Sequence, residues 1–135
     1  MFNIKFIQNI FMKKILATVV IICCAQMAKS QLANTTWSGT IKAEGGDLNV
    51  VWHISTDSSY MYNADDNALL DVSVIKVEDS TISIKKVSGL SSCDDGEGLY
   101  TFTLKENEVK FFLTKDDCYD RYGALDKATF IKKEK

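Results

Sequence analysis

The chain of 135 residues contains no proline and only one histidine, His53. It also has no G-x-S-x-G elbow, P-loop, Rossmann glycine pattern or H-E-x-x-H pair, which removes most hydrolytic, nucleotide-dependent and zinc-dependent sites. His53 stands in the opposite phase to its apolar neighbours Trp52 and Ile54, so we expect it to point outward. The sequence therefore predicts a protein that is not an enzyme and holds no cofactor.

The chain lacks an apolar run long enough to cross a membrane. The run from Ile15 to Ala25 has about 11 residues, and a spanning helix needs roughly 20. Two lysines precede this run, and Ala28-Lys29-Ser30 follows it as a small-x-small cleavage site, which is typical of a signal peptide. We therefore expect residues 1–30 to be removed near Ser30, which leaves a secreted or periplasmic protein.

Lipidation is the alternative outcome of export, since Cys24 could become a lipid-modified first residue. The preceding Ile21-Ile22-Cys23 lacks the usual small residue, so lipoprotein anchoring is less favoured. Translation could begin at Met1 or at Met12, and both starts give the same mature chain. Residues 31–135 form a stretch of 105 residues, which suffices for one small domain.

Positive charge is scarce in this mature stretch. It holds all 18 acidic residues but 12 of the 16 basic ones, so its formal charge is 12 − 18 = −6. Affinity for nucleic acid or for anionic lipid is not expected from such a charge.

Cysteine is scarce too, because only Cys93 and Cys118 remain after the signal peptide is removed. Two cysteines in an exported domain are expected to form a disulfide, with two free thiols as the alternative. Closing a loop of this length would stabilise the fold by roughly 3–4 kcal/mol on the chain-entropy model.

Alternation of apolar and polar residues recurs throughout the mature chain, whereas no segment shows a convincing helical period. The alternation is typical of half-buried β-strands. We predict strands near 35–44, 48–55, 59–63, 68–78, 81–88, 98–105, 108–115 and 127–133. Short turn segments separate most of them, which indicates an antiparallel meander. The stretch DDCYDRYGAL before the last strand is expected to hold one helical turn.

The fourth predicted strand changes its apolar phase, from Leu70, Val72 and Val74 to Ile75 and Val77. Such a shift indicates a β-bulge or a corner, as barrel closure requires. A sandwich remains the alternative, but a barrel is favoured because closure removes both exposed sheet edges. The predicted fold class is all-β: an eight-stranded antiparallel up-and-down barrel, closed by one disulfide.

LANTTWSGT at the first predicted strand and DDCYDRYGAL before the last one resemble segments of small exported bacterial barrel proteins of the lipocalin-like, or calycin-like, family. In lipocalins a glycine-x-tryptophan signature opens the first strand, and an arginine near the last strand lies across that tryptophan. The resemblance implies this barrel closure for Trp37 and Arg121, although Thr35 stands where the glycine is expected. The alternative is that Trp37 is plain core and Arg121 pairs with Asp117 or Asp120 on the surface.

Aromatic side chains are the best material for an apolar pocket. Alternating strand positions should send a set of rings to one face, where they could hold a hydrophobic ligand or simply fill a core. The candidate ligand-binding residues are Trp52, Tyr60, Tyr62, Tyr100 and Phe102.

Acidic pairs in the predicted loops are interpreted as solvated charge, because none follows the EF-hand spacing. No metal site is therefore predicted. If one existed, its ligands would be Asp94, Asp95, Asp116 and Asp117, whose loops the disulfide would join.

The leading functional hypothesis is an exported lipocalin-like barrel that binds a small apolar molecule without converting it. The alternative is an inhibitor of an extracellular or periplasmic hydrolase, such as a lysozyme or a protease. It would act through the rim loop GLSSCDDGEG, which the disulfide would pre-organise. A lined cavity would favour the first hypothesis and a filled barrel the second.

Overall fold

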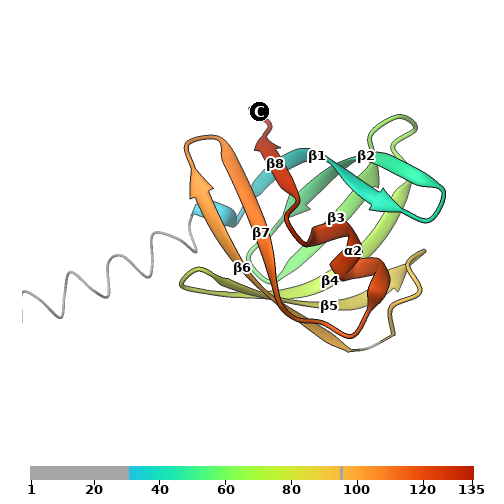
Figure 1. Cartoon of the computed structure of the whole chain (residues 1–135). Helices are drawn as coiled ribbons and strands as arrows, with labels where there is room; N and C mark the ends of the chain where they lie inside the picture. The colour runs from blue at the N-terminus through green and yellow to red at the C-terminus, as the bar shows by residue number, and fades with distance from the viewer. Residues whose placement is uncertain (1–30, 95) are drawn as a thin grey trace, which may run out of the picture.

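The computed structural model describes residues 31–94 and 96–135, so the predicted signal peptide and Cys24 lie outside the described residues. The strands form one closed antiparallel barrel in sequence order, and the last strand pairs with the first (Figure 1). They are β1 (Thr35–Ala43), β2 (Gly46–Ile54), β3 (Ser58–Asn63), β4 (Leu69–Glu78), β5 (Thr81–Gly89), β6 (Glu97–Lys105), β7 (Glu108–Lys115) and β8 (Thr129–Lys132), with helix α2 (Tyr119–Leu125) before β8. The predicted eight-stranded barrel is confirmed.

Strand formation follows the period-two pattern. In β2 the side chains of Val50, Trp52 and Ile54 are buried, whereas His53 between them is exposed, as predicted. The Nδ1 atom of His53 lies 2.8 Å from the hydroxyl of Thr36 on the outer face of β1. Each strand thus turns one face to the core and the other to solvent.

Aromatic rings fill the middle of the barrel. The ring centroid of Trp52 lies 5.3 Å from that of Phe111 and 5.4 Å from that of Phe130, and Phe102 lies 6.1 Å from Phe111. A Cβ atom at Gly39 would approach Phe130 to 2.6 Å, so the glycine leaves room for this ring against β1. The interior is therefore a packed core.

Register shifts bend the sheet as closure requires. One lies between Val72 and Ser73 where β4 pairs with β5, and another lies between Met61 and Tyr62 in the pairing of β3 with β4. The predicted irregularity in the fourth strand is present, but it precedes the predicted position. Ser73 faces the core at 8% exposure, whereas Val74 is 51% exposed.

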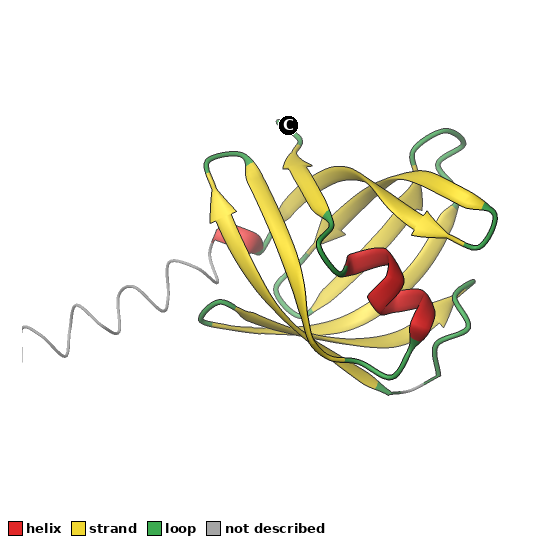
Figure 2. Ribbon diagram, viewed as in Figure 1, coloured by secondary structure: helices red, strands yellow, loops and turns green. Residues whose placement is uncertain are grey.

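The connections alternate between the two ends of the barrel, because every strand runs antiparallel to its neighbours. The β1–β2, β3–β4 and β5–β6 loops and the β7–β8 connection share one end, which we call the disulfide end. Helix α2 packs against β1 and β7 there (Figure 2). Its buried residues are Arg121 and Leu125. The start of β1, with the fully buried Leu32 before it, belongs to the opposite end.

No helix in residues 31–94 and 96–135 is long and apolar enough to cross a membrane.

Candidate functional site at the disulfide end of the barrel

A disulfide joins Cys93, in the β5–β6 loop, to Cys118, the residue before α2, with 5.4 Å between the two Cα atoms. The predicted pairing is confirmed. The carboxylate of Asp120 accepts hydrogen bonds from the backbone N–H and the hydroxyl of Ser92, at 2.8 and 2.7 Å. These bonds lower the pKa of Asp120. The loop is therefore held to α2 at two adjacent points.

Arg121 forms a buried ion pair with Asp116 beneath this loop. Its Nε atom donates to Oδ2 of Asp116 at 2.6 Å and its Nη2 atom donates to Oδ1 at 2.8 Å. Nη2 also donates to the carbonyl oxygen of Gly96 at 3.0 Å. The side chains of Arg121 and Asp116 are 8% and 0% exposed. This two-bond geometry is the strong form of an arginine–carboxylate pair.

Two further donors reach Asp116. The hydroxyl of Tyr100 donates to Oδ2 at 2.5 Å and the backbone N–H of Cys118 donates to Oδ1 at 2.9 Å. Burial alone would raise the pKa of Asp116, but the hydrogen bonds from Arg121, Tyr100 and Cys118 outweigh it and hold the pKa below its usual value. Burial, reinforced by Asp116, raises the pKa of Tyr100 above its usual value. At neutral pH Asp116 is therefore ionised and Tyr100 is protonated.

Gly98 makes room for the ion pair. It occupies an inward-facing position of β6, in phase with the buried Tyr100. A Cβ atom at Gly98 would clash with Oδ2 of Asp116 and would lie 2.7 Å from Nε of Arg121. The pair can lie across β6 only because this strand position has no side chain.

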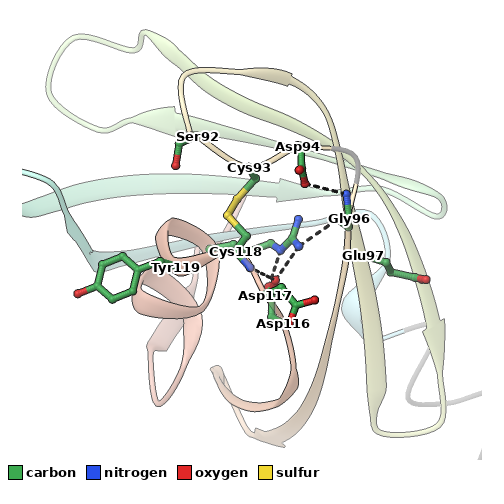
Figure 3. A pocket seen from close by; sticks show the side chains of 10 residues that line it. Ser92, Cys93, Asp94, Gly96, Glu97, Asp116, Asp117, Cys118 and Tyr119 are labelled. Atoms are coloured by element: carbon green, nitrogen blue, oxygen red, sulfur yellow. Dashed lines mark hydrogen bonds and ion pairs between the residues drawn. A yellow bond between two sulfur atoms is a disulfide. The ribbon is translucent and has the colours of Figure 1, made fainter.

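An open pocket of about 360 Å³ adjoins the ion pair (Figure 3). It is lined by Ser92, Cys93, Asp94, Gly96, Glu97, Asp116, Asp117, Cys118, Tyr119 and Arg121. Four of these are acidic and one is basic, so the formal charge of the lining is 1 − 4 = −3. Asp94, Glu97 and Asp117 are exposed, and none of them takes part in the ion pairs that the described residues form. The pocket is suited to a positively charged group.

One buried donor in the pocket wall is not satisfied. The Nη1 atom of Arg121 has no hydrogen-bond partner among the described residues. An unsatisfied buried donor costs about 1–3 kcal/mol. The atom has almost no surface open to solvent, so a ligand's acceptor oxygen could satisfy it only after a small shift of the pocket wall.

The five aromatic residues predicted to bind a ligand do not share a face. Trp52, Tyr100 and Phe102 point into the core. Tyr60 is 38% exposed on the outer wall, and Tyr62 is half-buried there with its ring edge-on to that of His53. In β3 the inward positions belong to Ser59 and Met61. Tyrosine can hold the outer position because its hydroxyl remains in water while its ring covers the sheet.

The predicted stacking of Arg121 on Trp37 is not what the structure shows. Trp37 is buried near the start of β1 and donates from Nε1 to the Thr35 hydroxyl at 2.7 Å. Arg121 lies in the β7–β8 connection, at the opposite end of the barrel, and binds Asp116. The alternative prediction of a surface pair with Asp117 or Asp120 also differs, because the partner is the buried Asp116.

Within the described part of the chain, no three histidine, cysteine, aspartate or glutamate side chains group together as a metal site. Asp95, one of the acids considered as a ligand, lies outside the described residues.

Sequence reasoning missed the cluster of Gly98, Tyr100, Asp116 and Arg121. A usable signal was the glycine at an inward phase of β6 in the segment GLYTF, since a missing side chain on a core face indicates that another group approaches the strand. The eight-stranded barrel is consistent with a lipocalin-like architecture. Comparisons of the chain with family models, curated proteins and solved structures found no match.

Proposed function

We propose that this is an exported, non-catalytic binding protein that takes a positively charged ligand group into the pocket at the disulfide end. The observation that carries the proposal is the charge of the pocket lining. Its only base, Arg121, is already neutralised by Asp116. The carboxylates of Asp94, Glu97 and Asp117 are left to face solvent and a ligand.

The electrostatic contribution should be modest and sensitive to salt. Each exposed pair between a carboxylate and a cation contributes about 0–1 kcal/mol, and salt screens such contacts over roughly 10 Å. Several carboxylates around one cation nevertheless favour it over a neutral or anionic analogue. Selectivity for charge is therefore a more informative readout than affinity alone.

A small apolar ligand inside the barrel receives less support than a ligand at the rim. Trp52 and Phe102 both pack near Phe111 in the filled core, so a guest there would have to displace core side chains. Hydrolase inhibition would use the same rim loop, but the pocket has no feature specific to a hydrolase target. The hydrolase-inhibitor hypothesis and our proposal thus share a binding site at the rim of the barrel, and we retain that part.

Export is part of the proposal. The disulfide fits an extracellular or periplasmic protein, because such bonds persist in oxidising compartments. Cleavage after Ser30 would give a mature protein beginning at Gln31. Intact-mass analysis of exported protein should find that start, and a lipid-modified Cys24 would contradict it.

The binding test is calorimetric titration of the mature protein with n-butylammonium, at low ionic strength and again with 0.5 M salt. The Glu97→Gln/Asp117→Asn double variant should bind at least fivefold more weakly. Glu134→Gln, an exposed acid after β8 at the opposite end, is the matched control and should bind as the parent does. Equal binding of butyrate or butanol, or an unaltered double variant, would defeat the proposal.

A further inference from the structure

We propose that the positively charged group is a lysine or arginine side chain of a protein partner, presented by a segment that also packs an apolar residue on Tyr119. The inference rests on the proposed function and names its partner. Three features of the disulfide end favour a larger ligand than a small cation.

The first feature is the exposed ring of Tyr119. This side chain lines the pocket and is 73% exposed, and the ring of Tyr122 supports it edge-on, with 5.3 Å between the centroids. Semi-rigid aromatic side chains in such positions are typical anchors of protein interfaces. A small ammonium ion can contact one point of this ring, but it leaves most of the ring exposed, whereas an apolar side chain would cover it.

The second feature is the breadth of the pocket. Figure 3 shows Tyr119 and Glu97 on opposite sides of the disulfide, each at the edge of the pocket. A ligand that meets a carboxylate on one side and the tyrosine ring on the other must be extended. A peptide segment with a basic residue beside an apolar one has that reach, because successive residues lie about 3.3–3.6 Å apart along an extended chain.

The third feature is the unpartnered donor. Nη1 of Arg121 lacks an acceptor among the described residues although its side chain is only 8% exposed. An alkylammonium ion has no acceptor to offer. A peptide brings a carbonyl oxygen with every residue, so it can supply the cation for the carboxylates and also an acceptor for this atom once a small shift of the pocket wall uncovers it.

The surface is also pre-organised for a macromolecular partner. The disulfide, the bonds between Ser92 and Asp120, and the bond from Arg121 to the Gly96 carbonyl hold residues 92, 93 and 96 in place before anything binds. Residues held in this way lose little conformational freedom on association, and the acidic rim steers a basic partner toward them. Charge complementarity therefore favours a basic protein surface as the occupant.

The experiment compares three probes that carry the same alkylammonium group with a fourth that lacks it. They are n-butylammonium, Nα-acetyl-lysine-N-methylamide, the pentapeptide acetyl-Gly-Leu-Lys-Leu-Gly-amide and the same pentapeptide with norleucine in place of lysine. Affinities are measured for the mature protein and for Tyr119→Ala and Tyr119→Phe, whose folding is verified by thermal unfolding. We expect affinity to rise from the amine to the amide to the lysine pentapeptide, by at least tenfold in total, with no binding of the norleucine peptide.

The ratio of pentapeptide affinity to amine affinity reports on the partner surface. Tyr119→Ala should reduce this ratio below threefold, and Tyr119→Phe should restore it. Equal binding of the amine and the lysine peptide would overturn the protein-partner inference while the proposed function stands. Tight binding of the norleucine peptide would overturn it as well. If none of the cationic probes binds, both the proposed function and the protein-partner inference are wrong.

Discussion

Asp116 receives hydrogen bonds from strand β6, from helix α2 and from the backbone before that helix, through Tyr100, Arg121 and Cys118. Its carboxylate has no exposed surface. Removing one member of a buried pair leaves an uncompensated charge, which costs more than the pair contributes. Single residues of this cluster should therefore dominate the stability of the disulfide end.

Asp116→Asn should lower the free energy of unfolding by about 3 kcal/mol, because it leaves the Arg121 guanidinium buried without its counter-charge. The measurement is urea denaturation at pH 7. Asp117→Asn is the matched control one residue away, and its exposed side chain predicts no measurable change. Similar effects of the two substitutions would rule out the buried pair.

The effect of Asp116→Asn should depend on pH. The pKa of Asp116 is lowered in the folded protein, so its stabilisation is present above the unfolded-state pKa of about 3.9 and is lost as the pH falls further. The difference in unfolding free energy between parent and variant should thus shrink from pH 7 to pH 2.5. A difference that stayed constant over this range would contradict the shift.

Gly98→Ala should destabilise the protein by about 3 kcal/mol, since its Cβ atom would displace both Asp116 and Arg121. Gly123→Ala in α2 provides the contrast, because nothing lies within 4 Å of a Cβ atom there. Alanine in a helix stabilises relative to glycine by roughly 0.5–1 kcal/mol. Thermal unfolding of both variants should shift in opposite directions, and a shift in the same direction would argue against the close approach at β6.

The identity of the buried acid could not be predicted from the sequence. Asp116 and Asp117 are adjacent and chemically identical, and only the three-dimensional approach of Tyr100 and Arg121 distinguishes them. The exposed position of His53 could be predicted, because it depends on the phase of one strand alone. Local sequence patterns predict which face of a strand a residue occupies, but they do not predict contacts between segments that lie far apart in the sequence.

At the scale of the elements, the β5–β6 loop and α2 behave as one unit because the disulfide and the Ser92–Asp120 bonds join them. Cys93→Ser/Cys118→Ser should lower the free energy of unfolding by about 3.5 kcal/mol on the chain-entropy model. Denaturant unfolding of the parent and the double variant measures this. An equal stability of the two would mean that the loop is held without the covalent bond.

Strand positions were predictable but the orientation of β3 was not. The predicted range 59–63 lies within the observed Ser58–Asn63. The error concerned its faces, since Tyr60 and Tyr62 were expected to share a face with the other candidate aromatic residues and instead cover the outer wall. Both faces of this strand carry residues that suit a pleated surface, so alternation alone could not decide which face is buried.

At the scale of the whole molecule, barrel closure places the first and last strands side by side, but the start of β1 and the segment that leads into β8 lie at opposite ends. β8 pairs with β1 at Trp37, as the fold prediction requires. The segment before β8 nevertheless belongs to the disulfide end, far from the start of β1. The pairing of β1 with β8 therefore does not bring Trp37 and Arg121 together. In an up-and-down barrel, the segment before the last strand lies at the end opposite to the start of the first strand.

The central claim is that this barrel binds at its acidic, disulfide-closed rim while its aromatic interior stays packed. Its most direct test is a two-dimensional amide NMR titration of the mature protein with n-butylammonium. We predict saturable shifts for the amides of residues 92–94, 96–98 and 116–119, with Trp52, Phe102 and Phe111 unmoved. Shifts centred on those three core residues, or no saturable shift at the rim, would contradict the claim.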